Sequence, residues 1–221
     1  MRLLTDPVLR RWILHLRRTA PVDLSALEQV DAVLVSHVHY DHLDLRSLRL
    51  LPAGATVVAP RGAKRLFRRF RDVREMDVGD ETSIGDVRIE ATLALHGSAR
   101  PTLRATPALG FVVHGSRSVY FAGDTDLFDG MAGLAGSLDV ALLPVAGWGP
   151  RLPAGHLNPE RAVEALGLLR PRIAVPIHWG TYARLGLRAS AEPPELFRRL
   201  AAERAPGVDV RILAPGAETT F

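Results

Sequence analysis

The sequence predicts a mixed α/β (α+β) protein in which two β-sheets pack together and helices cover their outer faces. Short apolar runs rich in Val, Ile and Leu recur along the chain and are separated by turn residues. The middle of the chain contains two hairpin patterns, and the remainder alternates strands with helical segments. This combination is typical of two sheets with external helices.

The first half of the chain alternates strands with short helices. Strands are predicted at Ala32–Val35, Thr56–Ala59 and Val73–Asp77, and helices at Leu45–Leu51 and Pro60–Phe70. Asp44 is the expected N-cap of the first helix. The second helix is basic and amphipathic, with Leu66, Phe67 and Phe70 facing inward.

Two hairpins and a series of strand–helix units complete the chain. The hairpins pair Thr82–Ile84 with Val87–Leu95 around Gly85-Asp86, and Gly110–Val113 with Ser118–Phe121 around Gly115-Ser116. Asn158 is the expected cap of a helix that has Pro159 at its first position. The later strands are predicted at Leu138–Leu143, Arg172–Pro176 and Val208–Leu213, and the later helices at Pro159–Leu169 and Pro194–Ala202.

Composition limits the class of protein. The 221 residues are 47% hydrophobic, which suits one domain over residues 1–221 with a sizeable core. The absence of cysteine excludes disulfides, thiolate nucleophiles and Cys metal ligands. The N-terminus has no signal-peptide pattern, and no apolar run is long enough to span a bilayer, so the cytoplasm is the expected location.

The charge is positive and carried by arginine. The formal net charge is +4, and Lys64 is the only lysine. Basic residues cluster at Arg10–Arg18 and at Arg61–Arg74. These clusters fit contact with phosphate or an anionic membrane surface. A solvated basic helix face is the alternative explanation and the preferred one. Nucleic acid is not expected, because no aromatic-plus-basic motif accompanies them.

The densest functional pattern follows the strand at Ala32–Val35. His37, His39, Asp41 and His42 place three imidazoles and a carboxylate within six positions. Such side chains bind zinc or iron. Residues two apart share a face while the chain is extended, whereas His42 is out of phase and requires a turn. The two halves of the cluster are therefore placed to address two adjacent metals.

Other ligand types follow three later strands. His96, Asp124 and His178 each come directly after a predicted strand, and a carboxylate such as Asp124 can bridge two cations. His156 lies just before a predicted helix, where it is expected to reach the substrate as a proton donor or oxyanion partner.

With these residues in place, the chain resembles the metallo-β-lactamase-fold hydrolases. Within them it most resembles the branch of N-acylphosphatidylethanolamine phospholipase D, and it is also similar to the ascorbate-6-phosphate lactonase branch. The resemblance implies a four-layer αββα sandwich with metals at one sheet edge. The quoted motifs are Thr5-Asp6-Pro7-Val8, Ser36 to Asp44, Phe121-Ala122-Gly123-Asp124-Thr125, Asn158 to Val163, and Ile177-His178-Trp179-Gly180-Thr181.

The same resemblance implies a ligand set. One metal would be held by His37, His39 and His96, and the other by Asp41, His42 and His178, with Asp124 shared. His156 matches a histidine that lines the substrate cleft of the phospholipase-like branch.

Two departures from the family pattern stand out. A β-hairpin usually precedes the Thr5-Asp6-Pro7 segment, whereas here Met1 almost directly precedes it, so the expectation is either a trimmed start or a missing edge strand. Phospholipase-like relatives carry an aromatic residue and a Ser-Gly-Arg run after the third histidine, where this chain has Gly97-Ser98-Ala99-Arg100.

The predicted activity is hydrolysis assisted by two divalent metal ions, with zinc expected ahead of iron or manganese. The two cations would lower the pKa of a bridging water to about 7 and polarise the phosphoryl or carbonyl oxygen. Asp41 would orient that water and His156 would donate a proton. Arg151 would help to shape the pocket and pair with an anionic group. Trp148 would either shape the pocket or simply pack within its loop.

Three functions remain open at this point. The preferred one is phosphodiester hydrolysis of a small-molecule or phospholipid-like anionic substrate, with Arg10–Arg18 contacting an anionic membrane surface. The alternative is a lactonase or other ester- or amide-directed hydrolase that uses the same metals. The third is a non-catalytic metal-binding or regulatory module.

Overall fold

The first sheet of the structure is short and wholly parallel. The computed structural model describes residues 1–100, 105–136, 138–148 and 152–221. The sheet has the order β1-β4-β5-β6. Its strands are β1 (Leu3–Thr5), β4 (Ala32–Leu34), β5 (Thr56–Pro60) and β6 (Val73–Met76).

The second sheet is larger and mixed, with the order β14-β12-β11-β10-β9-β8-β7. Its antiparallel half is formed by two hairpins, and its other half is parallel. The strands are β7 (Glu81–Ile84), β8 (Val87–Leu93), β9 (Leu109–His114), β10 (Ser118–Phe121), β11 (Val140–Pro144), β12 (Ile173–Ile177) and β14 (Asp209–Val210).

A small antiparallel sheet pairs a hairpin near the N-terminus with a strand that follows β12, in the order β13-β3-β2. Its strands are β2 (Trp12–Ile13), β3 (Leu16–Arg18) and β13 (Tyr182–Arg184). The helices are α1 (Pro159–Leu169) and α2 (Glu192–Arg204), together with the 3-10 helices η1 (Ser25–Gln29), η2 (Ser47–Leu50), η3 (Lys64–Leu66) and η4 (Asp129–Leu134).

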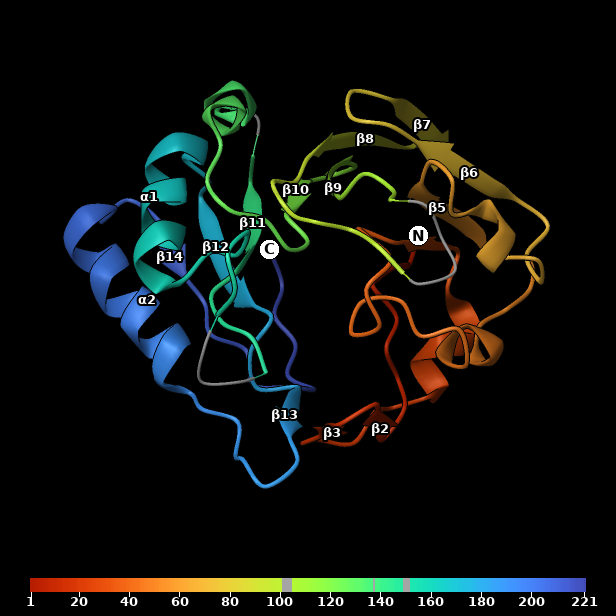
Figure 1. The fold of residues 1–221 in the computed structure, drawn as a ribbon. Helices are drawn as coiled ribbons and strands as arrows, with labels where there is room; N and C mark the ends of the chain where they lie inside the picture. The colour runs from red at the N-terminus through yellow and green to blue at the C-terminus, as the bar shows by residue number, and fades with distance from the viewer. Residues whose placement is uncertain (101–104, 137, 149–151) are drawn as a thin grey trace.

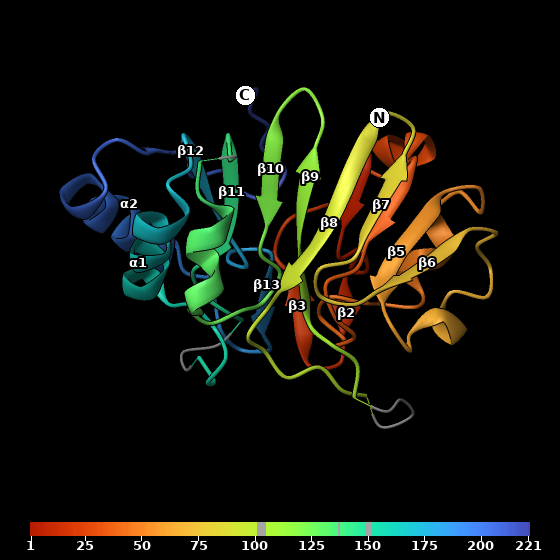
Figure 2. The same cartoon turned by 90° about the horizontal axis from the view of Figure 1, so that it is seen from above.

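A hydrophobic core lies between each pair of neighbouring layers. Alternate residues of a strand point to opposite faces, so Val57 and Ala59 face outward from the first sheet whereas Val58 faces the second sheet. Phe111 and Phe121 meet Val58 in the core between the sheets. Helices α1 and α2 cover the far face of the large sheet (Figure 1). Seen from above, the helices and the parallel sheet lie on opposite sides of the structure (Figure 2).

The predicted αββα layering is therefore present, but its two helical layers are unequal. The layer over the parallel sheet is built from 3-10 helices and loops, among them η1, η2 and η3. The predicted helix at Leu45–Leu51 is only the 3-10 helix Ser47–Leu50. The N-cap is Arg46 rather than the predicted Asp44, although the Asp44 carboxylate accepts the backbone N–H of Ser47 at 2.9 Å and so satisfies a donor of the first turn.

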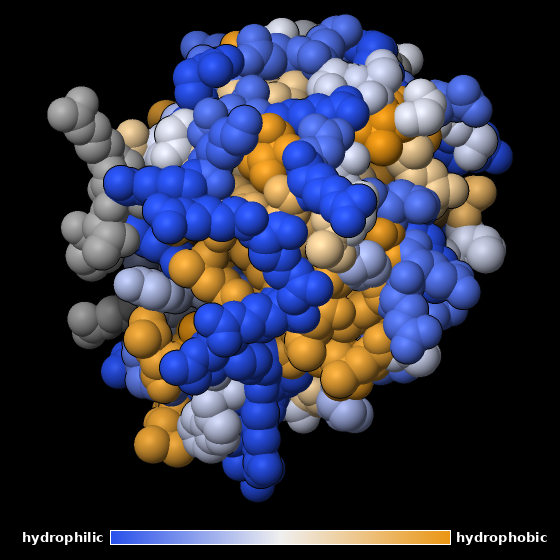
Figure 3. All heavy atoms as spheres, turned by 90° about the vertical axis from the view of Figure 1, so that its right-hand side faces the viewer, coloured by the Kyte–Doolittle hydropathy of each residue, from blue (hydrophilic) through white to orange (hydrophobic). Residues whose placement is uncertain are grey.

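The prediction of a helix over Pro60–Phe70 is wrong. Pro60 ends β5, and Gly62 turns the chain with φ 92°. The Glu75 carboxylate accepts the backbone N–H groups of Gly62 and Lys64, which fixes this turn. The expected inward face is nevertheless buried, since Phe67 and Phe70 pack into the outer core. Figure 3 shows the face of the molecule on the side of the parallel sheet, where hydrophilic side chains lie over apolar patches.

The interpretation of Arg10–Arg18 as a basic helix face is also wrong. This segment contains β2 and β3, which form a hairpin with Leu14 at its tip. The last predicted strand, Val208–Leu213, shortens to β14. The described residues contain no helix long and apolar enough to cross a membrane.

Candidate metal centre

The ligand-type side chains predicted from separate strand ends come together in space. His37, His39, Asp41 and His42 lie on the loop after β4, whereas His96, Asp124 and His178 follow β8, β10 and β12. Gly123 allows this convergence, because a Cβ at that position would lie 2.7 Å from Ser36 Cβ. Its φ of 60° also favours glycine.

The first triad consists of three imidazoles. His37 Nε2 and His96 Nε2 each lie 3.1 Å from His39 Nδ1. The three ligand atoms all lie within 4.8 Å of one another, a spacing at which one cation can be held by all three. We call His37, His39 and His96 the first triad.

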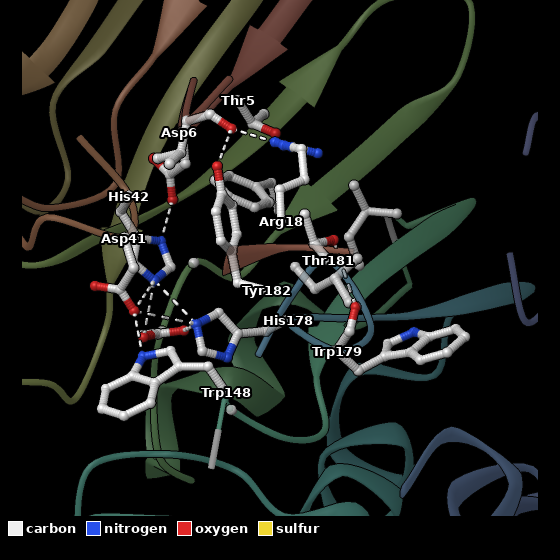
Figure 4. Close-up of a pocket in the computed structure, with 17 residues that line it drawn as sticks. Thr5, Asp6, Arg18, Asp41, His42, Trp148, His178, Trp179, Thr181 and Tyr182 are labelled. Carbon is white, nitrogen blue, oxygen red and sulfur yellow. Dashed lines mark hydrogen bonds and ion pairs between the residues drawn. The ribbon is translucent and has the colours of Figure 1, made fainter. Parts of the chain in front are cut away.

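The second triad contains a carboxylate. Asp41, His42 and His178 also place their ligand atoms within 4.8 Å of one another. His42 Nε2 lies 3.1 Å from His178 Nε2, and Asp41 Oδ2 lies 3.9 Å from each of these nitrogens. Figure 4 shows these three side chains grouped on one side of a pocket.

Asp124 lies beside both sets of ligands. Its Oδ2 is 3.0 Å from His42 Nε2 and its Oδ1 is 3.4 Å from His178 Nε2. Its ligand atom also lies within 4.8 Å of those of His96 and His156. Asp124 is buried, and its Oδ1 has no hydrogen-bond partner among the described residues. An unsatisfied buried carboxylate oxygen is costly, and a cation would satisfy it.

The hydrogen bonds of the other ring nitrogens fix which nitrogen carries the proton. His96 Nδ1 donates to the Gly155 carbonyl at 2.9 Å, and His178 Nδ1 donates to the Ala146 carbonyl at 2.6 Å. A carbonyl can only accept, so in the neutral form of both rings the Nε2 lone pairs face the centre. Lone pairs at such short separations repel one another, and a shared cation relieves this repulsion. The donor set therefore fits bound divalent metal.

Asp6 organises both triads from behind. Its Oδ2 accepts from His42 Nδ1 at 2.7 Å and from Ser36 Oγ at 2.6 Å. The Ser36 hydroxyl uses its only proton in the hydrogen bond to Asp6. Its oxygen therefore accepts a hydrogen bond from His37 Nδ1 at 2.9 Å. One carboxylate therefore directs the Nε2 lone pairs of His37 and His42 toward the centre.

Arg100 supports the loop that carries the first four predicted ligands. Its buried guanidinium donates to the backbone carbonyls of Val38, His39 and Leu43. The same group lies 4.3 Å from the centroid of the Tyr40 ring. These contacts fix a loop that must turn sharply between two sets of ligands.

The electrostatics of the site favour cations. Burial lowers the pKa of the His37 ring well below its usual value, and neighbouring imidazoles act in the same direction, which keeps the ring in the neutral form that binds metal. Burial opposes charge on His42 as well, yet Asp124 and Asp6 raise its pKa well above the usual value. The carboxylates thus create a negative potential that would stabilise a bound divalent cation.

The structure places the predicted substrate residues unequally. His156 Nε2 lies 3.3 Å from Asp124 Oδ2, and its ring centroid lies 4.6 Å from that of His96. Trp148 Nε1 donates to Asp41 Oδ2 at 3.0 Å, so Trp148 contacts a predicted ligand directly. Arg151 lies outside the described residues, and its predicted role remains a prediction.

Two pockets meet at the centre. One has a volume of about 280 Å³ and contains Asp41, His42 and His178 in its wall (Figure 4). The other has a volume of about 570 Å³ and is bounded by His39, His96 and His156. Asp41, Asp124, Trp148 and His178 line both pockets, so a ligand can approach the candidate metal centre from two sides.

The sequence did not predict the roles of three residues near the centre. Asp6 and Arg100 were noted only as parts of motifs, and Arg18 only as part of a basic cluster. Their contacts join residues far apart in the chain, for example Asp6 with His42. The Thr5-Asp6-Pro7 motif was the only available signal for Asp6, and it carried no indication of a partner.

Comparison with known proteins agrees with this geometry. A profile described as the β-lactamase superfamily domain matches residues 1–179. The chain belongs to this family. A UPF0173 metal-dependent hydrolase of Caldivirga maquilingensis is 33% identical over 97% of this chain and 88% of its own length. A UPF0173 protein of Pyrococcus furiosus is 31% identical over 88% of this chain and 84% of its own length.

Solved structures with a similar fold superpose on most of the chain. Igni18, a metallo hydrolase from Ignicoccus hospitalis, has a TM-score of 0.68 at 28% identity and covers 86% of this chain and 79% of its own. Isothiocyanate hydrolase from Delia radicum gut bacteria has a TM-score of 0.75 at 24% identity, covering 99% and 92%. The predicted superfamily and fold are thus confirmed, and the names of relatives agree with the predicted hydrolase class.

Proposed function

We propose that this protein is a hydrolase with a binuclear metal centre and that it cleaves phosphodiesters. The observation that carries the binuclear part of the proposal is the position of Asp124. Its Oδ1 has no hydrogen-bond partner among the described residues, and its carboxylate lies close to His42 and His178 of the second triad and to His96 of the first. The first triad would hold one divalent cation and the second triad the other, with Asp124 between them. When bound, the cations would supply Lewis acidity and lower the pKa of water.

The proposed proton donor is His156. Its Nδ1 donates to the Pro153 carbonyl at 3.1 Å, and its Nε2 points toward Asp124. Burial opposes protonation, but the hydrogen bond and charge of Asp124 raise the pKa of His156 above its usual value. A protonated Nε2 at this position can donate to the oxygen that leaves the substrate.

Asp41 is proposed to orient the attacking water. Its carboxylate is held by the Trp148 indole and lies beside His42 and His178. A carboxylate fixed in this way can accept a proton from water while its other oxygen remains near a cation. The phosphodiester preference itself rests on the resemblance to the phospholipase-like branch.

The decisive experiment compares turnover of bis(4-nitrophenyl) phosphate and of a simple lactone by metal-loaded protein. Phosphodiester turnover is expected in the wild type and is expected to disappear in His37→Ala. His114→Ala is the matched control, because His114 ends β9 and contacts Glu90 rather than the centre. Turnover that survives in His37→Ala would contradict catalysis at this site.

A lactone or other ester is the second candidate substrate. The larger pocket supports it, because Ile13, Leu14, Leu16 and Leu152 form an apolar wall close to the first triad. Such a wall suits the neutral ring of a lactone better than a charged diester. Turnover of lactones without turnover of phosphodiesters would select this candidate.

Zinc is the proposed metal, with iron and manganese as the alternatives. Five of the seven proposed ligands are imidazoles, a ligand type that suits zinc and iron, whereas carboxylates also accept manganese. Metal analysis of protein purified without added metal would identify the ion, and about two ions per chain are expected.

Peripheral contact with an anionic membrane is proposed for the hairpin of β2 and β3. Leu14 is 70% exposed at its tip and Trp12 is 41% exposed, with Arg11 and Arg17 nearby. Apolar tips flanked by arginine suit a membrane interface. Sedimentation with phosphatidylserine vesicles at low salt tests this contact, and failure to sediment would remove it.

A further inference from the structure

We propose that Arg18 binds an oxyanion of the substrate, a carboxylate or a phosphate separate from the bond that is cleaved. The binding site is the smaller pocket, next to the second triad. The proposal rests on the proposed function in one respect, because the anion belongs to the molecule whose reactive group reaches the metal centre.

The smaller pocket connects Arg18 with the second triad. Its wall contains His42 and His178 as well as Arg18 and Tyr182. In the view of Figure 4, Arg18 lies across the pocket from Asp41 and Trp148. A ligand in this pocket can therefore face the second triad with one group and Arg18 with another.

Arg18 is partly buried, and it has no carboxylate partner among the described residues. Its Nη2 donates to the Val8 carbonyl, and its Cζ lies 4.9 Å from the centroid of the Tyr182 ring. Its Nε is buried and has no hydrogen-bond partner, and none of the ion pairs between described residues includes Arg18. By contrast, Arg10 on the same segment is paired with Asp44 at 2.7 Å.

An unpaired guanidinium in a partly buried position is costly unless a ligand supplies the missing acceptor. Three carboxylates line the pocket, but each has another partner: Asp6 binds His42 and Ser36, Asp41 accepts from Trp148, and Asp124 faces the imidazoles. The guanidinium therefore remains available to an oxyanion, which it recognises through paired N–H donors.

The guanidinium is also held in place before any ligand binds. Arg18 pairs with Tyr182 across the β3–β13 ladder. The Tyr182 hydroxyl donates to the Arg10 carbonyl at 2.5 Å, which fixes the ring against Arg18. A rigid donor loses little conformational freedom on binding, so it contributes more to affinity.

The remaining wall defines the rest of the ligand. Phe121, Leu142 and Ile177 supply apolar surface in the same pocket. The expected substrate therefore carries its anionic group on a short apolar spacer, at a distance from the bond that is hydrolysed.

The test measures binding rather than turnover. Succinate, glutarate and adipate are titrated calorimetrically into zinc-loaded protein and compared with butyrate and valerate. One carboxylate is expected to reach the metal centre and the second to reach Arg18. At least one dicarboxylate should bind about tenfold more tightly than the monocarboxylates. Repeating the titration with 3-phosphonopropionate shows whether Arg18 prefers phosphonate or carboxylate.

Arg18→Met should reduce this preference below about threefold, and Arg18→Lys, which keeps the charge, should retain part of it. Arg17→Met is the matched control, because Arg17 is exposed on the same strand and does not line this pocket. Circular dichroism melts show whether each variant is folded. If Arg18→Met is unfolded, Arg18→Lys decides: an unchanged preference in that variant contradicts recognition by the paired donors.

Three outcomes would overturn the proposal: equal binding of mono- and dicarboxylates to the wild type, a preference that survives in folded Arg18→Met, or an equal loss in Arg17→Met. A dicarboxylate preference in a protein that turns over no phosphodiester, lactone or ester would contradict the proposed function while leaving the anion site in place.

Discussion

The two triads of the candidate centre differ in charge and in the way they are held. The first presents imidazoles only, with His37 oriented by a hydroxyl and His96 by a backbone carbonyl. The second includes the Asp41 carboxylate, and its His42 is oriented by the Asp6 carboxylate. Asp124 also lies close to His42 and His178. The second triad is therefore the more anionic one, and we expect it to accept a wider range of metals than the first.

The largest effect is expected when the residue between the two triads loses its charge. Asp124→Asn keeps the size of the side chain but removes the negative charge next to both triads. Bound metal should fall to below about one ion per chain and hydrolysis should fall by about 10³-fold, since bound cations contribute several kcal/mol to catalysis. Elemental analysis and initial rates check this result. Asp126→Asn is the control, because Asp126 pairs with Arg161, and full metal content in Asp124→Asn would show that Asp124 is not a shared ligand.

Removing one imidazole from each triad separates their contributions. His39→Ala and His42→Ala should each lower the metal content from about two ions to about one. In the wild type, chelation should lower Tm by on the order of 10 °C, because ligand present at about 1,000 times its Kd stabilises by about 4 kcal/mol. The shift should be smaller in either variant. Scanning calorimetry with and without chelator measures it, and equal shifts in all three proteins would argue against two separate sites.

A smaller effect is expected from the residue that orients both triads. Asp6→Asn keeps the shape of the side chain but weakens its acceptance from His42 and Ser36. Metal affinity should fall by about 10- to 100-fold, as is usual when a group that orients a metal ligand is lost. Competition with a fluorescent chelator measures this affinity. An unchanged affinity would mean that the loop geometry, supported by Arg100, is sufficient to orient the rings.

The smallest effect is expected on the second triad alone. Trp148→Phe removes the indole N–H that binds Asp41 and keeps most of the ring. Loss of one hydrogen bond of about 0.5–1.5 kcal/mol corresponds to a change of roughly 2- to 12-fold. Metal affinity at the second triad should fall by that factor while the first triad is unaffected. Cobalt absorption spectra of the two sites distinguish these outcomes, and an equal change at both triads would contradict a local role.

The sequence predicted the sheets better than the layers around them. Strands such as β5 and β12 are buried apolar runs, so their composition identifies them directly. Strands β1, β3 and β13 were not predicted, because they are three residues long and contain Thr or Arg. Pairing with distant segments creates these strands, and a local pattern carries no information about such pairing.

The ligand-type residues of the centre were found in the sequence because strand ends meet at one edge of a sheet. Supporting residues were not, because their roles depend on which distant atoms they reach. The carbonyl that orients His96 belongs to Gly155, and the one that orients His178 belongs to Ala146. Any residue has a backbone carbonyl, so residue types could not indicate these contacts.

The spacing of the ligands along the chain sets an order in which the two triads can assemble during synthesis. His39 and His96 are 57 positions apart, whereas His42 and His178 are 136 positions apart. A nascent chain thus possesses the whole first triad long before it possesses the second. The longer loop also has the larger closure entropy. If the two triads hold ions as proposed, the first triad is the earliest point at which a growing chain could capture one, and a second ion would require synthesis to pass His178.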